Sequence, residues 1–151
     1  MKSCEILPKR VSDLLVPLRE LINSLSLRKK LPQIELAVTD EALALVLRVL
    51  EKLTADDEAK LRQFQKDYGV DFWYQPKGPD SIYPMDPENA TRLKLHHRET
   101  GVEVVFRPTD FTQVNHRLNE VMVTRALRLL HLEPSSKVID FFCGLGNFTL
   151  P

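Results

Sequence analysis

The strongest constraint on the fold is the stretch VIDFFCGLGN at residues 138–147. Its first part, residues 138–142, is an apolar run around a single carboxylate, Asp140, which predicts a strand buried on both faces of a parallel sheet. Gly144 and Gly146 then allow the backbone to turn with positive φ and to approach a ligand closely. Doubly wound α/β folds bind ligands where a strand, a glycine turn and a helix follow one another, so we predict an α/β fold.

The residues around the turn narrow the choice of ligand. A phosphate-binding P-loop needs a Lys followed by Ser or Thr, and the turn has neither in that place. The dinucleotide fingerprint needs a third glycine where this chain has Thr149. A ligand without phosphates, such as S-adenosylmethionine, therefore fits the turn better. A Gly-x-Gly by itself is also compatible with a tight turn that follows a core strand and binds nothing.

The rest of the chain has the pattern of alternating helices and strands. Leucine spacing predicts a helical segment over residues 7–25, which Pro17 divides or kinks. Thr54 and Gly69 suit the N-cap and the C-terminal stop of a second helix. Asn115 suits the cap of another helix, on which one face is shared by Leu118, Val121, Met122, Ala126, Leu129 and Leu130. Strands are expected at 34–39, 43–50, 70–75, 93–97 and 102–106, with a loop at 76–89 and a hairpin between the last two strands.

Composition excludes several classes of protein. With 21 basic and 21 acidic residues in 151, the chain has no overall positive field that would indicate nucleic-acid binding on its own. Local basic groups at 28–30 and 92–98 are most simply solvated faces. Two cysteines, Cys4 and Cys143, give no disulfide framework and suit a reducing compartment. No signal peptide is recognised, and the longest apolar stretch, 43–50, is too short to cross a membrane. We therefore predict a cytoplasmic protein without a membrane partner.

Two blocks of sequence resemble the RNA uracil-5-methyltransferases. The first is DFTQVN at residues 110–115, and the second is DFFCGLGNFTLP at residues 140–151, one helix further on. Within that family the chain is most similar to the enzymes of large-subunit ribosomal RNA that carry an iron–sulfur cluster. Residues 5–107 match more loosely, mainly in the order of their elements. The resemblance covers most of this chain but only the middle of a family member.

The resemblance implies a domain organisation and an activity. Residues 1–107 correspond to a central α+β region, and residues 108–151 to the start of a Rossmann-like methyltransferase domain, truncated here. The implied activity is methyl transfer from S-adenosylmethionine to C5 of a uridine in ribosomal RNA. In the family a cysteine thiolate adds to C6 of the uracil, and a base later removes the C5 proton. Both groups would lie beyond Pro151, so no catalytic residue is assigned and the chain is expected to be inactive alone.

The same resemblance implies a set of binding residues. Phe111 faces the target uracil in the family, and Gln113 reaches both the cofactor and the target. An aromatic face can replace the stacking that a flipped base loses, and a carboxamide can donate and accept hydrogen bonds together. The expected cofactor residues are Gln113, Asp140, Phe142, Gly144, Gly146 and Asn147. Open alternatives are a core position for Phe111, a helix-start hydrogen bond for Gln113, and a structural role for Asp140 within the loop.

Both cysteines have implied roles that exclude catalysis. Cys143 is expected to pack in the cofactor loop and not to act as the nucleophile. Cys4 stands where the iron–sulfur members of the family have the fourth cluster ligand. Cluster ligation takes four thiolates, and the other three would lie upstream of Met1. We therefore do not expect this chain to form the cluster by itself.

Two other functions remain open. One is a catalytically inactive module that binds RNA or protein through residues 34–106, and the other is a different class of S-adenosylmethionine enzyme. In each case the apolar run at 138–142 lacks the parallel neighbours that it needs. We expect residues 116–151 of the isolated chain to be poorly ordered, or to self-associate through the unpaired strand 138–142. Residues 5–107 are expected to form the stable core.

Overall fold

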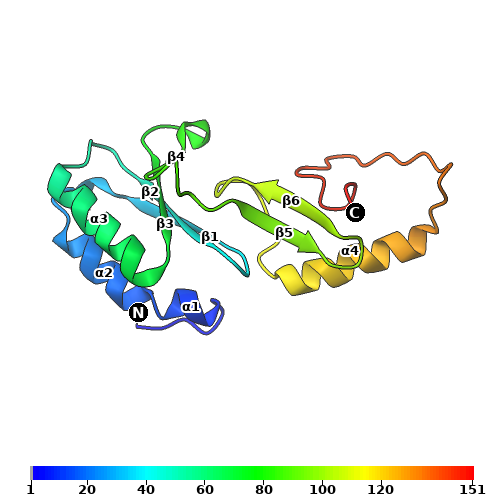
Figure 1. Cartoon of the computed structure of the whole chain (residues 1–151), viewed down its shortest axis with the longest axis horizontal. Helices are drawn as coiled ribbons and strands as arrows, with labels where there is room; N and C mark the ends of the chain where they lie inside the picture. Colours follow the sequence, from blue (N-terminus) through cyan, green and yellow to red (C-terminus); the bar gives the residue numbers. More distant parts are fainter. Residues whose placement is uncertain (1) are drawn as a thin grey trace. The chain divides into compact units, whose positions relative to one another are not determined.

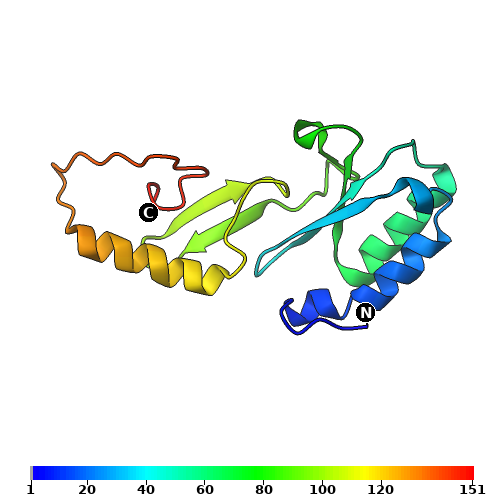
Figure 2. The ribbon, with the colours of Figure 1, turned by 180° about the vertical axis from the view of Figure 1, so that it is seen from behind.

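The computed structural model describes residues 2–151, and the chain divides into two compact units. The first unit ends at Thr91, and the second runs from Arg92 to Pro151. Figure 1 and Figure 2 show the chain from opposite sides. The division precedes the hairpin, which therefore groups with the C-terminal helix. The boundary predicted at residues 107 and 108 concerns the domains of a longer enzyme and stays a prediction.

A four-stranded sheet forms the centre of the first unit, in the order β1-β2-β3-β4. β1 (Gln33–Val38) and β2 (Leu43–Arg48) are antiparallel neighbours. Both strands were predicted, and the connection between them is short, which suits antiparallel pairing. β3 (Asp71–Gln75) runs parallel to β2, because a helix between them carries the chain back across the sheet. The predicted loop after β3 contains η2 (Pro79–Ser81) and the two-residue strand β4 (Tyr83–Pro84), which pairs antiparallel with β3.

Helices pack on the sheet of the first unit. α1 (Lys9–Ser12) and α2 (Leu15–Ser24) are the two helical pieces predicted for this segment. Pro17 lies in the first turn of α2, where backbone N–H groups have no partner within the helix, so the missing N–H of proline costs no hydrogen bond. Figure 1 shows α2 beside α3 (Ala55–Tyr68). The helices and the sheet share an apolar core, which includes Val11, Leu14, Leu25, Leu27, Leu43, Leu45, Leu47, Leu61, Phe64, Phe72 and Tyr74.

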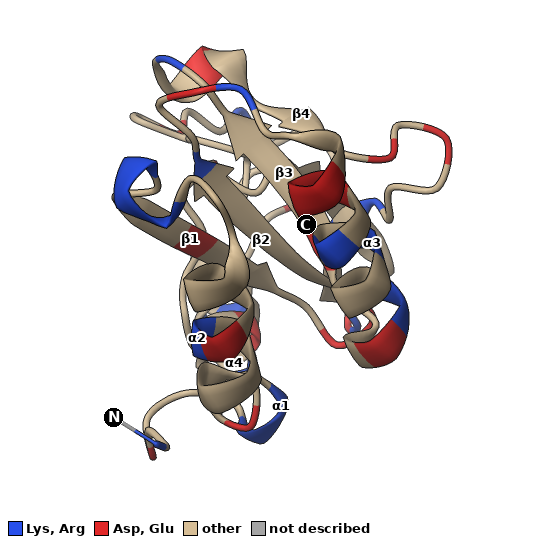
Figure 3. Ribbon diagram, turned by 90° about the vertical axis from the view of Figure 1, so that its left-hand side faces the viewer, with Lys and Arg blue, Asp and Glu red and all other residues tan. Residues whose placement is uncertain are grey.

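A capping box fixes the start of α3. The Thr54 hydroxyl accepts from the Asp57 N–H at 3.1 Å, and the Asp57 carboxylate accepts from the Thr54 N–H at 3.3 Å. Asp57 also accepts from the backbone N–H and the hydroxyl of Ser26, so this fully buried carboxylate ties α3 to the segment after α2. Gly69 ends the helix with a φ of 60°. Charges of both signs are distributed along α3 (Figure 3), which is the pattern of a solvated face.

The second unit consists of a hairpin, one helix and a C-terminal segment. β5 (Leu93–His97) and β6 (Val102–Phe106) pair antiparallel, and Gly101 takes a φ of 72° at their turn. α4 (His116–Leu130) begins at Asn115, whose side chain accepts from a backbone N–H in the first turn. The sequence predictions of the hairpin, the helix and its cap are therefore confirmed.

The buried face of α4 is not the face on which most of its apolar residues lie. The helix runs alongside the hairpin (Figure 2), where Arg128 pairs with Glu99 at 3.0 Å. Its buried residues are Asn119 and Val123. The predicted apolar face is largely exposed, at Leu118, Val121, Met122, Leu129 and Leu130. The helix thus buries a polar residue and leaves apolar side chains in solvent.

The strand predicted at residues 138–142 is wrong for this structure. Residues 136–140 have no regular secondary structure, and residues 141–142 lie in a turn. The apolar side chains of the run are exposed, with 78% for Ile139 and 81% for Phe141. A parallel strand needs hydrogen-bonded neighbours, and residues 2–151 provide none for this run. The α/β prediction is confirmed for the mixed sheet with its helices, but the described residues form no Rossmann-like sheet.

Candidate functional site

A pocket of about 430 Å³ lies within the second unit. One wall is the loop 110–113 before α4, another is the segment 142–148 that contains the glycine turn, and Leu95 of β5 completes it. The pocket brings together five of the predicted binding residues, namely Phe111, Gln113, Phe142, Gly144 and Asn147. Asp140 and Gly146, also predicted, are not among the residues that line it.

Hydrogen bonds at both ends hold the loop before α4. Asp110 accepts from the Arg107 N–H at 2.7 Å and from the Arg107 guanidinium at 3.2 Å. At the other end Asn115 caps α4, so the helix-start bond considered for Gln113 is made by another residue. Phe111 is 82% exposed and is not a core residue in this structure. The loop therefore presents an aromatic ring and a carboxamide to the pocket.

The backbone of the glycine turn leaves space for a ligand. Gly144 and Gly146 have φ of 56° and 79°, which glycine adopts without strain. A Cβ on Gly144 would meet no atom within 4 Å, whereas one on Gly146 would lie 2.8 Å from the Cγ of Leu150. Phe142 also has a positive φ, 62°, which is unfavourable for a residue with a bulky side chain, and its ring is fully exposed. Bare backbone and an aromatic ring thus face the same pocket.

Asp140 contacts the end of the same segment. It accepts a short hydrogen bond from the hydroxyl of Thr149, the residue that replaces the third glycine of the dinucleotide fingerprint. The bond joins the two ends of the segment around the glycine turn. Of the two roles that the sequence left open for Asp140, this contact corresponds to the structural one.

Asn147 is anchored by a residue that the sequence did not single out. Asn119 of α4 and Asn147 exchange two hydrogen bonds of 2.8 Å between their carboxamides. His97 of β5 is also buried. Burial lowers the pKa of His97, and the nearby Glu120 carboxylate and Asn147 side chain offset this only in part. The available sequence signal was Asn119 itself, a polar residue at the edge of the apolar face of α4, one turn before Val123.

Comparisons with known proteins identify relatives of this chain. No protein-family model matches it. Over all 151 residues it is 55% identical to the 23S rRNA (uracil(1939)-C(5))-methyltransferase RlmD of Ralstonia pickettii. It is 56% identical over its whole length to the proteins of the same name from Cupriavidus necator and Burkholderia lata. The chain is homologous to these methyltransferases. It spans about a third of their length, 33%, 34% and 32% respectively.

The methyltransferase homology confirms the resemblance that two short blocks indicated. Residues 5–107, which were expected to match only loosely, are included in the matched length. The homology therefore covers both compact units of the structure.

The metal ligand implied for Cys4 stays a prediction. The Cys4 thiol is free and partly buried, and its backbone N–H donates to the Ser12 hydroxyl at 2.9 Å. In residues 2–151 no group of three or more His, Cys, Asp or Glu side chains could hold a metal ion. Cys143 is also free and lines the pocket of the second unit. Across the same described residues, none of the helices has the length and apolar character needed to traverse a bilayer.

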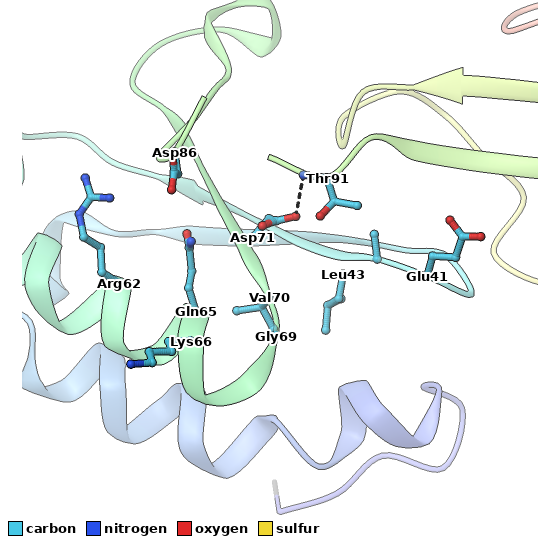
Figure 4. Close-up of a pocket in the computed structure, with 11 residues that line it drawn as sticks. Glu41, Leu43, Arg62, Gln65, Lys66, Gly69, Val70, Asp71, Asp86 and Thr91 are labelled. Carbon is cyan, nitrogen blue, oxygen red and sulfur yellow. Dashed lines mark hydrogen bonds between the residues drawn. The ribbon is translucent and has the colours of Figure 1, made fainter. Parts of the chain in front are cut away.

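A second pocket, of about 440 Å³, lies in the first unit at the C-terminal end of α3 (Figure 4). Its lining combines the cationic side chains of Arg62 and Lys66 with the carboxylates of Asp71 and Asp86. Asp71 already accepts from the Thr91 N–H at 3.1 Å, the contact drawn in Figure 4. Because charges of both signs line this pocket, it favours neither an anion nor a cation, and we assign no ligand to it.

Proposed function

We propose that this chain contributes base- and cofactor-binding residues to a ribosomal RNA uracil-5-methyltransferase. The observation that carries the proposal is the pocket of the second unit, which gathers five predicted binding residues in a chain 55% identical to such an enzyme. The proposed reaction is methyl transfer from S-adenosylmethionine to C5 of a uridine in 23S rRNA. S-Adenosylmethionine would supply the methyl group. The groups that attack and deprotonate the uracil are not among the residues assigned here.

The lining of the pocket fits a flat, mostly uncharged ligand. Aromatic rings of Phe111, Phe142 and Phe148 stand near the carboxamides of Gln113 and Asn147. Stacking faces and a few polar groups suit an adenosine or a uracil, and aromatic rings also attract a cation such as a sulfonium. The open backbone at Gly144 would allow a ligand to approach closely.

We assign the residues to two neighbouring ligands. Phe142, Gly144, Gly146 and Asn147 would contact S-adenosylmethionine, with Asp140 holding the end of the turn through Thr149. Phe111 would stack on the flipped uracil, because a ring that is 82% exposed is available to a base. Gln113 would lie between the two ligands. In the longer enzyme, residues 1–107 would form the central region and residues 108–151 would begin the methyltransferase domain.

A chimera tests the proposal. In this chimera the present chain replaces the matching third of the Ralstonia pickettii relative, and methyl incorporation at C5 of 23S rRNA uridine is measured. The chimera should be active, and Phe111→Ala should lower its methyl transfer by roughly 5- to 150-fold, the equivalent of about 1–3 kcal/mol of lost stacking. Its melting temperature should barely change.

Ile6→Ala is the matched control, because Ile6 is also highly exposed, at 91% against 82% for Phe111, but lies outside the pocket. It should leave methyl transfer unchanged. Unchanged turnover in the Phe111 variant, combined with a lower melting temperature, would assign Phe111 to packing. A folded chimera that transfers no methyl group would reject the proposed function.

A further inference from the structure

Asn119 lies on the buried side of α4 and is 4% exposed. Asparagine is a weaker helix former than alanine or leucine, and burial of a carboxamide is unfavourable unless its donors and acceptors are paired. Val123, one turn later on the same side, is 1% exposed and apolar. Packing of α4 against its surroundings therefore does not by itself require an asparagine at position 119.

The hydrogen bonds of Asn119 lead to the glycine turn. Its Nδ2 donates to Oδ1 of Asn147, and Nδ2 of Asn147 donates to its Oδ1, both at 2.8 Å. α4 and the glycine turn thus meet at this pair of carboxamides.

The bonding capacity of Asn147 determines what it can still offer. A carboxamide has two N–H donors and an oxygen that accepts two hydrogen bonds. Asn119 takes one of the two acceptor positions on the oxygen and one of the two N–H groups. One N–H of Asn147 remains, and Asn147 lines the pocket of the second unit.

We propose that Asn119 is a positioning residue, which holds Asn147 so that its second N–H is offered to a hydrogen-bond acceptor on the bound ligand. The inference rests on the proposed function, in which that ligand is S-adenosylmethionine. A ribose hydroxyl or a carboxylate oxygen is an acceptor of the required kind. Asn119 does not line the pocket itself, so it acts through Asn147.

The carboxamide pair can be tested in the 151-residue chain itself. In amide correlation spectra, the side-chain N–H of Asn147 that donates to Asn119 should exchange slowly with solvent. Asn119→Ala should abolish this protection, because it removes both bonds. Val123→Ala is the matched control: it removes buried apolar surface from the same side of α4 and should leave the Asn147 protection in place. Fast exchange of the Asn147 side chain in the unmodified chain would overturn the inference.

The effect on the ligand is tested in the chimera by calorimetry with S-adenosylmethionine. Asn119→Ala should weaken binding by about tenfold or more, the loss expected when a ligand hydrogen bond is no longer pre-aligned. It should raise KM for S-adenosylmethionine and leave KM for RNA unchanged. Asn119→Asp keeps the shape but lacks the donor to Asn147, and it should show the same direction of change. Val123→Ala should lower Tm and keep Kd within about twofold.

The outcomes separate the two claims. An unmodified chimera that folds but binds no S-adenosylmethionine would overturn the proposed function and this inference together. A chimera that binds it, and binds it equally well with Asn119→Ala, would overturn the positioning role alone. Equal weakening by Asn119→Ala and Val123→Ala, at equal loss of Tm, would also overturn it, because both residues would then act only through stability.

Discussion

Asp57 joins two segments of the first unit through one ionised side chain. Burial by itself raises the pKa of this carboxyl group, but hydrogen bonds with the side chains and backbones of Ser26 and Thr54 outweigh that effect and leave the pKa below its ordinary value. The folded state therefore favours the ionised form of the Asp57 side chain. The capping-box bonds of Asp57 are local contacts within the start of α3. The contact with Ser26 joins residues 31 positions apart, so it depends on the tertiary structure.

Asp57→Ala should lower the free energy of unfolding by about 2–4 kcal/mol, because it removes a helix cap and leaves buried donors unpaired. Urea titrations measure the change. Asp56→Ala is the control, since Asp56 is exposed and pairs with Lys60 on the surface, and it should cost at most about 0.5 kcal/mol.

The Asp57 contribution should also depend on pH. The pKa is lower in the folded state than in the unfolded state, so the contribution is complete above the ordinary carboxyl pKa, about pH 4, and is lost as the pH falls through the folded value. The difference between the wild type and Asp57→Ala should therefore shrink at acidic pH. A constant difference from pH 7 to pH 2.5 would contradict this account.

At the scale of elements, the two glycines of the turn have different surroundings. Both have positive φ, so a side chain at either position strains the backbone by about 1–2 kcal/mol. Only at Gly146 would a Cβ also collide with Leu150, at 2.8 Å from its Cγ. At Gly144 the space is open, and in the proposed function it is where the ligand approaches.

Gly146→Ala should therefore perturb the turn itself, and Gly144→Ala should mainly obstruct the ligand. Backbone amide shifts of residues 142–150 should change more in the Gly146 variant of the chain. In the chimera, the Gly144 variant should keep its melting temperature within a few degrees and lose affinity for S-adenosylmethionine. The idea fails if both variants change the amide shifts and the affinity to the same extent.

At the scale of the whole molecule, the second unit exposes an unusual amount of apolar surface. One face of α4 and the run 138–142 lie in solvent. Full burial of a large apolar side chain is worth about 1.5–3 kcal/mol, so these residues favour any contact that covers them. The first unit, in contrast, places its helices over an apolar core that includes both middle strands of the sheet.

Hydrogen exchange on a dilute sample should therefore distinguish the two units. Amides of β2 and α3 should be strongly protected, and amides of residues 131–151 should exchange rapidly, because they take part in no strand ladder. At higher concentration, sedimentation should show self-association. Strong protection of residues 138–142 in a proven monomer would show that this segment is stable without a partner.

The chain by itself should bind S-adenosylmethionine weakly or not at all. Its pocket has two loops and one strand residue as walls, and it includes a fully exposed Phe142 ring, so most of a ligand would remain in solvent. Calorimetry checks this expectation. A micromolar dissociation constant would contradict it, because it would mean that these walls alone bind S-adenosylmethionine.

The sequence by itself determined the features whose cause is local. Pro17 lies in the first turn of α2, Thr54 and Gly69 bound α3, and Gly101 closes the hairpin, as their residue types predict. Each depends on φ preferences or on a side chain that reaches the backbone within a few residues. The two blocks at 110–115 and 140–151 also indicated the family, because motif spacing is a property of the sequence.

The tertiary structure decided which surfaces meet. The apolar spacing of α4 indicated one face, and the fold buries Asn119 and Val123 on another. The apolar run 138–142 has the composition of a buried strand and yet forms none, because a strand exists only where neighbours pair with its backbone. The Asn119–Asn147 pair spans 28 positions and depends on the packing of α4, which no local pattern encodes. Pairing and burial are non-local, and for that reason the sequence predicted the helices and the other strands of this protein but neither the state of residues 138–142 nor the contacts that position the candidate site.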